Sequence, residues 1–307
     1  SEGIGAKSAV VSHFNYEICE RFAPIFLRRT HVILISSLLL ADSLLDRPGK
    51  YDRDVQIIAH TPIAEYSPAY SNSISCDVNY SDADLNYFKD LLQAEIARYP
   101  RGYWIKARAG KVVPCRNFKV NGVNRGGMSA PDIDTIFLAL PDDDLANLAT
   151  MNPDADYSLR NILIDSIHHE LTHNFNFSIY SVRGVIYRDP YWDSLKPSSF
   201  EYGTYVTGSV PYPLHFPQGP WPNYRHFWNP IPAFVSDYAT TSFAEDRAEI
   251  GAGIMGNQFW EINEICRTDS FVAAKVNQTI SEMNRFWPFE GTNDTKWKRR
   301  ISQMSCD

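Results

Sequence analysis

An apolar stripe between residues 159 and 177 constrains the fold of this chain more than any other feature. Its members recur at intervals of three and four positions: Leu159, Ile162, Leu163, Ile167, Leu171 and Phe175. Residues with this spacing share one face of an α-helix, so the stripe predicts a helix over residues 159–177 that packs against a core. Asp156 or Ser158 is suited to cap its first turn.

This predicted helix carries the segment His169-Glu170-Leu171-Thr172-His173, an HExxH pattern. The two histidines lie one turn apart, where their imidazoles can converge on one Zn²⁺. Glu170 is placed to act as general base, taking a proton from the water that attacks a carbonyl. The alternative is a helix with surface histidines. His168 points about 100° away around the helix, so we expect it to be packed or solvated and not a ligand.

A catalytic zinc site usually has three protein ligands, so a third is expected downstream. Glu245 lies in the first turn of a helix predicted over residues 242–257, and Glu249 lies one turn later on the same face. Glu245 is therefore the candidate third ligand, and Glu249 a candidate hydrogen-bond acceptor for a ligand histidine. The spacing Ser242-x-x-Glu245 also fits a capping box, in which Glu245 would bind the Ser242 amide instead.

Two further segments accompany the HExxH pattern: Phe234-Val235-Ser236-Asp237-Tyr238-Ala239 and Glu245-Asp246-Arg247-Ala248-Glu249. Together they resemble the gluzincin peptidases related to anthrax lethal factor and the zinc-binding metallopeptidases of bacterial surface lipoproteins, over residues 133–286. The resemblance implies that Glu245 is the third zinc ligand, Glu249 the outer-shell acceptor and Tyr238 the donor to the oxyanion. A phenol is chemically suited to that role, because it can share the charge that develops on a carbonyl oxygen. Arg247 departs from the phenylalanine of the family, which leaves the packing beneath this helix open.

Together with the resemblance, the remaining patterns predict an α+β, zincin-like fold with a mixed sheet, the HExxH helix and a mainly helical C-terminal subdomain. Helices are predicted over much of residues 1–50 and at residues 82–97 (capped by Ser81), 242–257 and 270–286. Strands are predicted at residues 55–58, 104–113 and 135–140. We expect residues 135–140 to be the sheet edge along which an extended peptide adds as a strand. Residues 1–130 form a helical and mixed region without an assigned role, and residues 131–307 the catalytic region.

Residues 178–234 differ in character from the rest of the catalytic region. Nine of the 19 prolines fall between Pro190 and Pro232, interleaved with tryptophan, tyrosine and phenylalanine. Proline blocks helix interiors and central strands, so this insertion is predicted to be a long ordered loop region. It is either a structural insertion or a wall over a substrate cleft.

The net charge of −7 gives no electrostatic reason to expect nucleic-acid binding. The longest apolar stretch, residues 32–41, falls well short of the roughly 20 residues that a membrane-spanning helix needs. None of the five cysteines forms a CxxC pair, which argues against a cysteine zinc site. Disulfides Cys76–Cys115 and Cys266–Cys306 with one free thiol are our expectation, and five reduced thiols are the alternative.

These features predict a zinc-dependent endopeptidase that acts on a peptide or protein substrate and is secreted or at the cell surface. The main alternative is a zincin-fold binding module whose zinc is not catalytic. A metal hydrolase that acts on a non-peptide amide is a third possibility.

Overall fold

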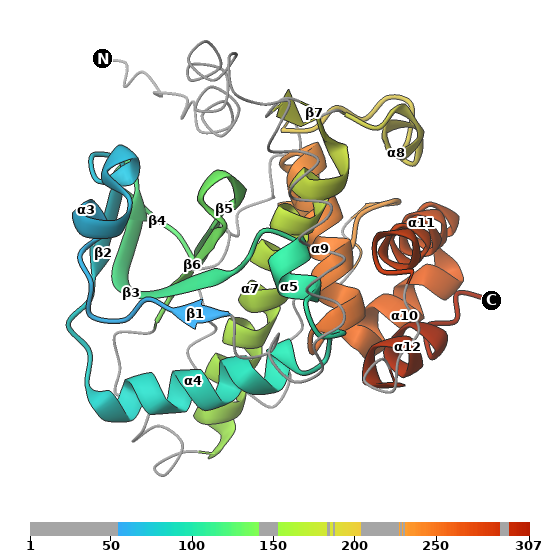
Figure 1. Cartoon of the computed structure of the whole chain (residues 1–307). Helices are drawn as coiled ribbons and strands as arrows, with labels where there is room; N and C mark the ends of the chain where they lie inside the picture. Colours follow the sequence, from blue (N-terminus) through green and yellow to red (C-terminus); the bar gives the residue numbers. More distant parts are fainter. Residues whose placement is uncertain are drawn as a thin grey trace, which may run out of the picture.

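The computed structural model describes residues 55–140, 153–182, 185–186, 188–203, 227, 229, 231–288 and 295–307. The helical prediction for residues 1–50 and most of the proline-rich insertion lie outside these residues. In the described part, a mixed sheet and a group of helices lie on opposite sides of the long helix α7 (Figure 1). The fold class is therefore α+β.

The helices of the described chain are α3 (Ile63–Tyr66), α4 (Asp82–Ile96), α5 (Tyr103–Lys106), α7 (Pro153–Tyr180), α8 (Pro190–Ser194), α9 (Phe243–Met255), α10 (Phe259–Thr268), α11 (Ser270–Phe286) and α12 (Thr295–Ser302), with 3-10 turns η2 (Pro68–Tyr70), η3 (Pro131–Ile133) and η4 (Tyr238–Thr240). The helices predicted at residues 82–97, 159–177, 242–257 and 270–286 are confirmed as α4, α7, α9 and α11. The Ser81 hydroxyl caps α4 as predicted, because it accepts a hydrogen bond from the Asp84 amide.

The sheet has the strand order β1-β3-β6-β5, in which β1 (Gln56–Ile57), β3 (Lys111–Val120) and β6 (Thr135–Ala139) run parallel and β5 (Gly127–Ala130) pairs with β6 antiparallel. Strands β2 (Ile74–Asp77) and β4 (Val123–Asn124) both pair with β3 antiparallel. A separate ribbon joins β7 (Ser181–Val182) to β8 (Val185–Ile186). Because β3 pairs with β6, residues on both sides of residue 130 share one sheet.

The predicted strand at residues 135–140 is confirmed as β6, but the prediction that it forms the sheet edge is wrong. β6 lies between β3 and β5, and β5 is the terminal strand of the order. The four residues of β5, Gly127-Met128-Ser129-Ala130, are few and include no β-branched or aromatic residue, so they carry little of the signal that identifies a strand in a sequence. This edge strand packs beside α7 (Figure 1).

The strand predicted at residues 104–113 is correct only in its last part. Residues 103–106 form the short helix α5 instead, and β3 begins at Lys111. A turn separates the two elements: the Ala109 amide donates to the Trp104 carbonyl, and Arg108 has a positive φ of 61°. The segment predicted as one strand is therefore shared between a helix and a strand.

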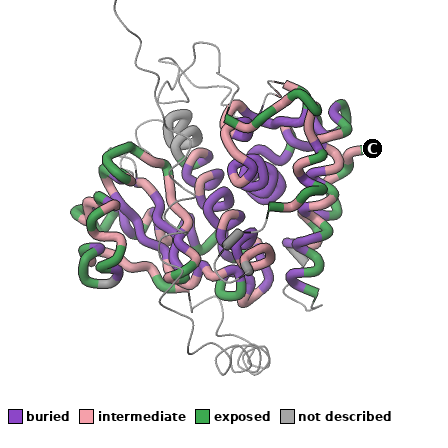
Figure 2. The backbone as a smooth tube through the Cα atoms, turned by 90° about the horizontal axis from the view of Figure 1, so that it is seen from above, coloured by how far each residue is buried: buried purple, intermediate pink, exposed green. Residues whose placement is uncertain are grey.

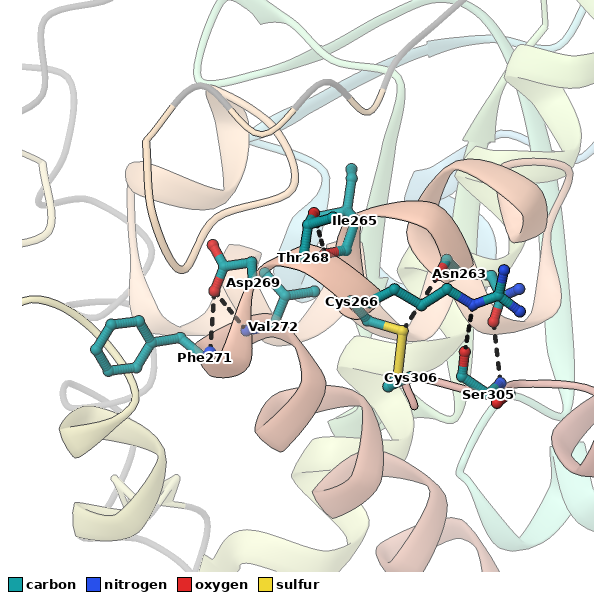
Figure 3. Close-up of a disulfide and its surroundings, with 10 residues drawn as sticks. Asn263, Ile265, Cys266, Thr268, Asp269, Phe271, Val272, Ser305 and Cys306 are labelled. Carbon is teal, nitrogen blue, oxygen red and sulfur yellow. Dashed lines mark hydrogen bonds between the residues drawn. A yellow bond between two sulfur atoms is a disulfide. The ribbon is translucent and has the colours of Figure 1, made fainter.

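Both expected disulfides are present. Cys76–Cys115 joins β2 to β3, and Cys266–Cys306 joins α10 to the C-terminal segment (Figure 3). Next to the second bridge, the Asp269 carboxylate caps α11 by accepting from the Phe271 and Val272 amides. No described helix has the length and apolarity required to cross a membrane.

Helix α9 is buried on nearly every side, and Figure 2 shows the buried backbone running through the interior of the molecule. Yet this helix carries four consecutive or near-consecutive charged residues, Glu245, Asp246, Arg247 and Glu249, and all four are buried. Buried charges are costly unless they are paired or bind an ion. The partners of these four side chains therefore show which charges are paired within the protein and which are available to an ion.

Candidate metal centre

Helices α7 and α9 approach each other closely at one crossing point. A Cβ added at Gly251 would lie 2.3 Å from the Thr172 hydroxyl oxygen, so only glycine permits this approach. The crossing brings the HExxH turn of α7 against the first two turns of α9. Side chains from the two helices can therefore meet at one point.

His169, His173 and Glu245 meet there. The Nε2 atom of His169 lies 2.9 Å from Glu245 Oε2 and 3.1 Å from His173 Nε2, and His173 Nε2 lies 3.2 Å from the same Glu245 oxygen. This group can hold a metal ion. Two ligand atoms about 2.0–2.2 Å from one tetrahedral zinc would lie roughly 3.3 Å apart, so the three separations fit a zinc ligand set to within a few tenths of an ångström.

The backbone amide and the carboxylate of Glu245 have different partners, so its place in a helix cap and its place in the cluster do not compete. Its backbone N–H is capped, because the Ser242 hydroxyl accepts from it at 3.1 Å. Its carboxylate faces the two histidines. One residue therefore contributes its amide to the helix cap and its side chain to the cluster.

Glu249 lies behind His169, as predicted for an outer-shell acceptor. Its Oε1 is 2.8 Å from His169 Nδ1, and because a carboxylate only accepts, Nδ1 is the donor. This hydrogen bond leaves the Nε2 lone pair of His169 available for a metal. Burial lowers the pKa of His169, but the hydrogen bonds to Glu245 and Glu249 outweigh burial and hold it well above its usual value. The site thus attracts positive charge.

Glu170 projects toward the edge strand β5. The Ser129 backbone N–H donates to its carboxylate, and burial raises its pKa, which the nearby histidines oppose. A Cβ added at Gly127 would lie 2.6 Å from Glu170 Cγ and 2.7 Å from its Oε1. Glycine at this position is what leaves space for the carboxylate between the helix and the strand.

Tyr238 begins the turn η4 and lies beside His169. Its ring centroid is 5.7 Å from that of His169, with the rings tilted by 35°. The side chain is half-buried. The structure therefore brings Tyr238 beside the first histidine, where the sequence analysis expects an oxyanion donor.

His168 points away from the cluster, as expected. It is fully buried, with Nδ1 2.8 Å from the Tyr99 hydroxyl and Nε2 2.8 Å from Glu95 Oε2. These contacts join α7 to Glu95 of α4 and to Tyr99, which follows α4. Of the two outcomes expected for His168, packed or solvated, the structure shows the packed one.

Arg247 of α9 is buried. Its guanidinium lies 4.3 Å from the Trp192 ring centroid and 4.5 Å from that of Tyr180, and it forms an ion pair with Glu282 of α11. Stacked aromatic rings and a carboxylate replace the apolar contacts of a phenylalanine. Residue 247 therefore still packs beneath the helix, but through cation–π contacts and an ion pair instead of apolar contacts.

Two residues of this site were not identified from the sequence, Gly127 and Ser236. The Ser236 hydroxyl donates to Glu249 Oε2 at 2.6 Å. Its place in the Phe234–Ala239 segment was the available signal, because the resemblance rests on that segment. For Gly127, the adjacent pair Gly126-Gly127 was the available signal, since close backbone approach often requires glycine.

No family model, no curated protein and no solved structure matches this chain. The site is therefore defined by its own geometry: two imidazole nitrogens and one carboxylate oxygen from two packed helices, beside a buried glutamate.

Proposed function

We propose that this chain is a zinc-dependent endopeptidase with a zincin-like fold. The observation that carries the proposal is the convergence of His169 Nε2, His173 Nε2 and Glu245 Oε2, with pairwise separations of 2.9–3.2 Å. Two histidines and one glutamate form a typical ligand set of catalytic zinc, which keeps one position open. Structural zinc sites more often have four protein ligands, so this set favours catalysis over a purely structural role.

Zinc bound to these residues would supply Lewis-acid chemistry, polarising a peptide carbonyl and acidifying water. Glu170 would accept the proton of the attacking water at its carboxylate and then deliver that proton to the departing amine. Glu249 would hold the Nδ1 proton of His169. The Tyr238 hydroxyl would donate to the carbonyl oxygen as negative charge develops there.

The position of the base supports a peptide as the substrate. Glu170 lies against β5, the terminal strand of the described sheet, to which an extended chain can add as a further strand. We propose that the substrate pairs with β5 and so presents its backbone carbonyl near Glu170. This replaces β6, which is an interior strand and has no free edge.

The two disulfides support a location outside the reducing cytosol, because structural disulfides persist mainly in oxidising compartments. We therefore propose that the protein is secreted or displayed at a cell surface.

Zinc content and peptide cleavage, each measured with and without a chelator, test the proposal. Glu170→Gln should retain zinc, since Glu170 is no ligand, and should lose turnover by about 100- to 10,000-fold. Glu264→Gln, which changes an exposed glutamate on α10, is the matched control and should cleave normally. Stoichiometric zinc without any cleavage would favour a zincin-fold binding module instead, and absence of zinc binding would refute both.

A further inference from the structure

Ser236 is fully buried and lies two residues before Tyr238. Its hydroxyl makes two hydrogen bonds in opposite directions. It donates to Glu249 Oε2 at 2.6 Å and accepts from the Ala239 backbone N–H at 3.0 Å. A serine hydroxyl has one proton and free lone pairs, so both bonds form at once.

Each bond leads to a different part of the proposed catalytic site. Through Glu249, whose other oxygen accepts from His169 Nδ1, the Ser236 hydroxyl is linked to the first metal ligand. Through the amide of Ala239, it is linked to the turn η4, whose first residue is Tyr238. One hydroxyl therefore connects the helix α9 carboxylate to the loop that carries the phenol.

We propose that Ser236 is a positioning residue that fixes the His169 imidazole and the Tyr238 phenol relative to each other. This inference rests on the proposed function. Without the hydroxyl, Glu249 loses the donor at its Oε2 atom, so its orientation toward His169 is less restrained. The Ala239 amide in the Tyr238 turn also loses its hydrogen-bond acceptor. Metal affinity and transition-state stabilisation are then both weakened by one change.

Chelator competition and steady-state kinetics on Ser236→Ala test the link. We expect zinc affinity to fall about tenfold, at the lower end of the range for outer-shell changes. At saturating zinc, kcat should fall about tenfold while KM changes by less than about twofold, because the phenol contact strengthens only in the transition state. Thermal unfolding of the variant, with chelator present, verifies that it is folded.

Thr240→Val is the matched control. Thr240 is equally buried in the same turn, but its hydroxyl donates to the Asp237 backbone carbonyl. This variant should keep the zinc affinity and kcat of the wild type. An equal loss in Thr240→Val would mean that any buried hydroxyl of the turn matters and would overturn a specific role for Ser236.

A double-variant cycle tests whether Ser236 acts through Glu249. In a Glu249→Ala background, Ser236→Ala should change zinc affinity by less than about twofold, because the pathway is already broken. The same tenfold loss in both backgrounds would overturn the proposal. If the wild type binds zinc and Ser236→Ala equals it, only the positioning role fails. If the wild type binds no zinc, the proposed function itself fails.

Discussion

Glu245 and Asp246 are adjacent buried carboxylates on α9, yet their oxygen atoms contact different kinds of side chain. The Asp246 Oδ2 atom accepts from Lys275 Nζ at 2.7 Å, from the Trp192 indole at 2.8 Å and from the Tyr202 hydroxyl at 2.7 Å. Glu245 Oε2 faces two imidazole nitrogens that also face each other.

The difference lies in the chemistry of the partners. Lysine, tryptophan and tyrosine supply fixed donors and one positive charge, so the Asp246 carboxylate is already neutralised. Burial raises the pKa of Asp246 and the charge of Lys275 opposes this, while burial lowers the pKa of Lys275 and Asp246 opposes it. Imidazole nitrogens can instead present lone pairs. Glu245 and its histidines therefore form a site that a cation completes, whereas the Asp246 carboxylate already has a cationic partner in Lys275, and only its Oδ1 atom lacks a hydrogen-bond partner among the described residues.

Asp246→Ala tests the structural half of this comparison and should have the largest effect on stability. Removing one partner of a buried ion pair costs about 3–5 kcal/mol, because Lys275 is left uncompensated. The loss should be the same with zinc and with chelator, measured by denaturant unfolding. Adding Lys275→Met should recover much of the stability. A loss seen only in the presence of zinc would show that Asp246 belongs to the metal site and would remove the distinction.

Glu245→Ala tests the other half. The variant should lose zinc, and with it the stabilisation that bound metal gives by mass action, about 4 kcal/mol at zinc concentrations near 1,000 times Kd. In chelator the loss of stability should be smaller, because only the contacts of Glu245 with the two histidines are removed and no bound metal is lost. Melting temperatures with and without zinc measure this. Unchanged zinc content would return Glu245 to a helix-capping role.

Tyr238→Phe and Tyr202→Phe sharpen the comparison with one hydroxyl removed from each cluster. Tyr238→Phe should slow turnover about a hundredfold, near 3 kcal/mol, with little change in KM. Tyr202→Phe should leave turnover unchanged and lower the unfolding free energy by about 1.5–3 kcal/mol, because its donor serves a charged acceptor. Steady-state kinetics and unfolding of both variants decide this. Normal turnover in Tyr238→Phe would make that tyrosine structural.

The long helices were predictable because their sequences carry the helical period over many turns and end at recognisable caps. The proximity of His169 and His173 was predictable for the same reason, since side chains four residues apart lie one turn apart on the same face of a helix. Spacing on α9 made Glu245 and Glu249 candidates but left a capping role open for Glu245, and the predicted ligand and acceptor roles came from the resemblance. Local periodicity therefore predicts which residues share a helix face, but not what each of them binds.

Contacts between distant segments were not predictable. The Lys275–Asp246 pair joins residues 29 positions apart on two helices whose packing no pattern specifies. Strand β5 has only four residues and none of them is β-branched or aromatic, so neither its existence nor its edge position could be inferred. The predicted sheet edge was β6, which lies one strand inside the observed edge strand β5. Sequence periodicity predicts the helices and strands, but the packing between them determines which strand lies at the edge of the sheet.

Gly127→Ala probes that edge and should have the smallest effect of this series. The added Cβ would lie 2.6 Å from Glu170 Cγ, so the carboxylate of the proposed base must shift. Since a misplacement of 1 Å costs roughly a hundredfold in rate, we expect kcat to fall about tenfold with zinc content unchanged. Gly126→Ala is the matched control, because its Cβ would meet only Ser166 Oγ at 3.7 Å, an ordinary contact. Equal kcat values for the two variants and the wild type would show that β5 does not position Glu170, and the assignment of β5 as the substrate-binding edge would then lose its link to the base.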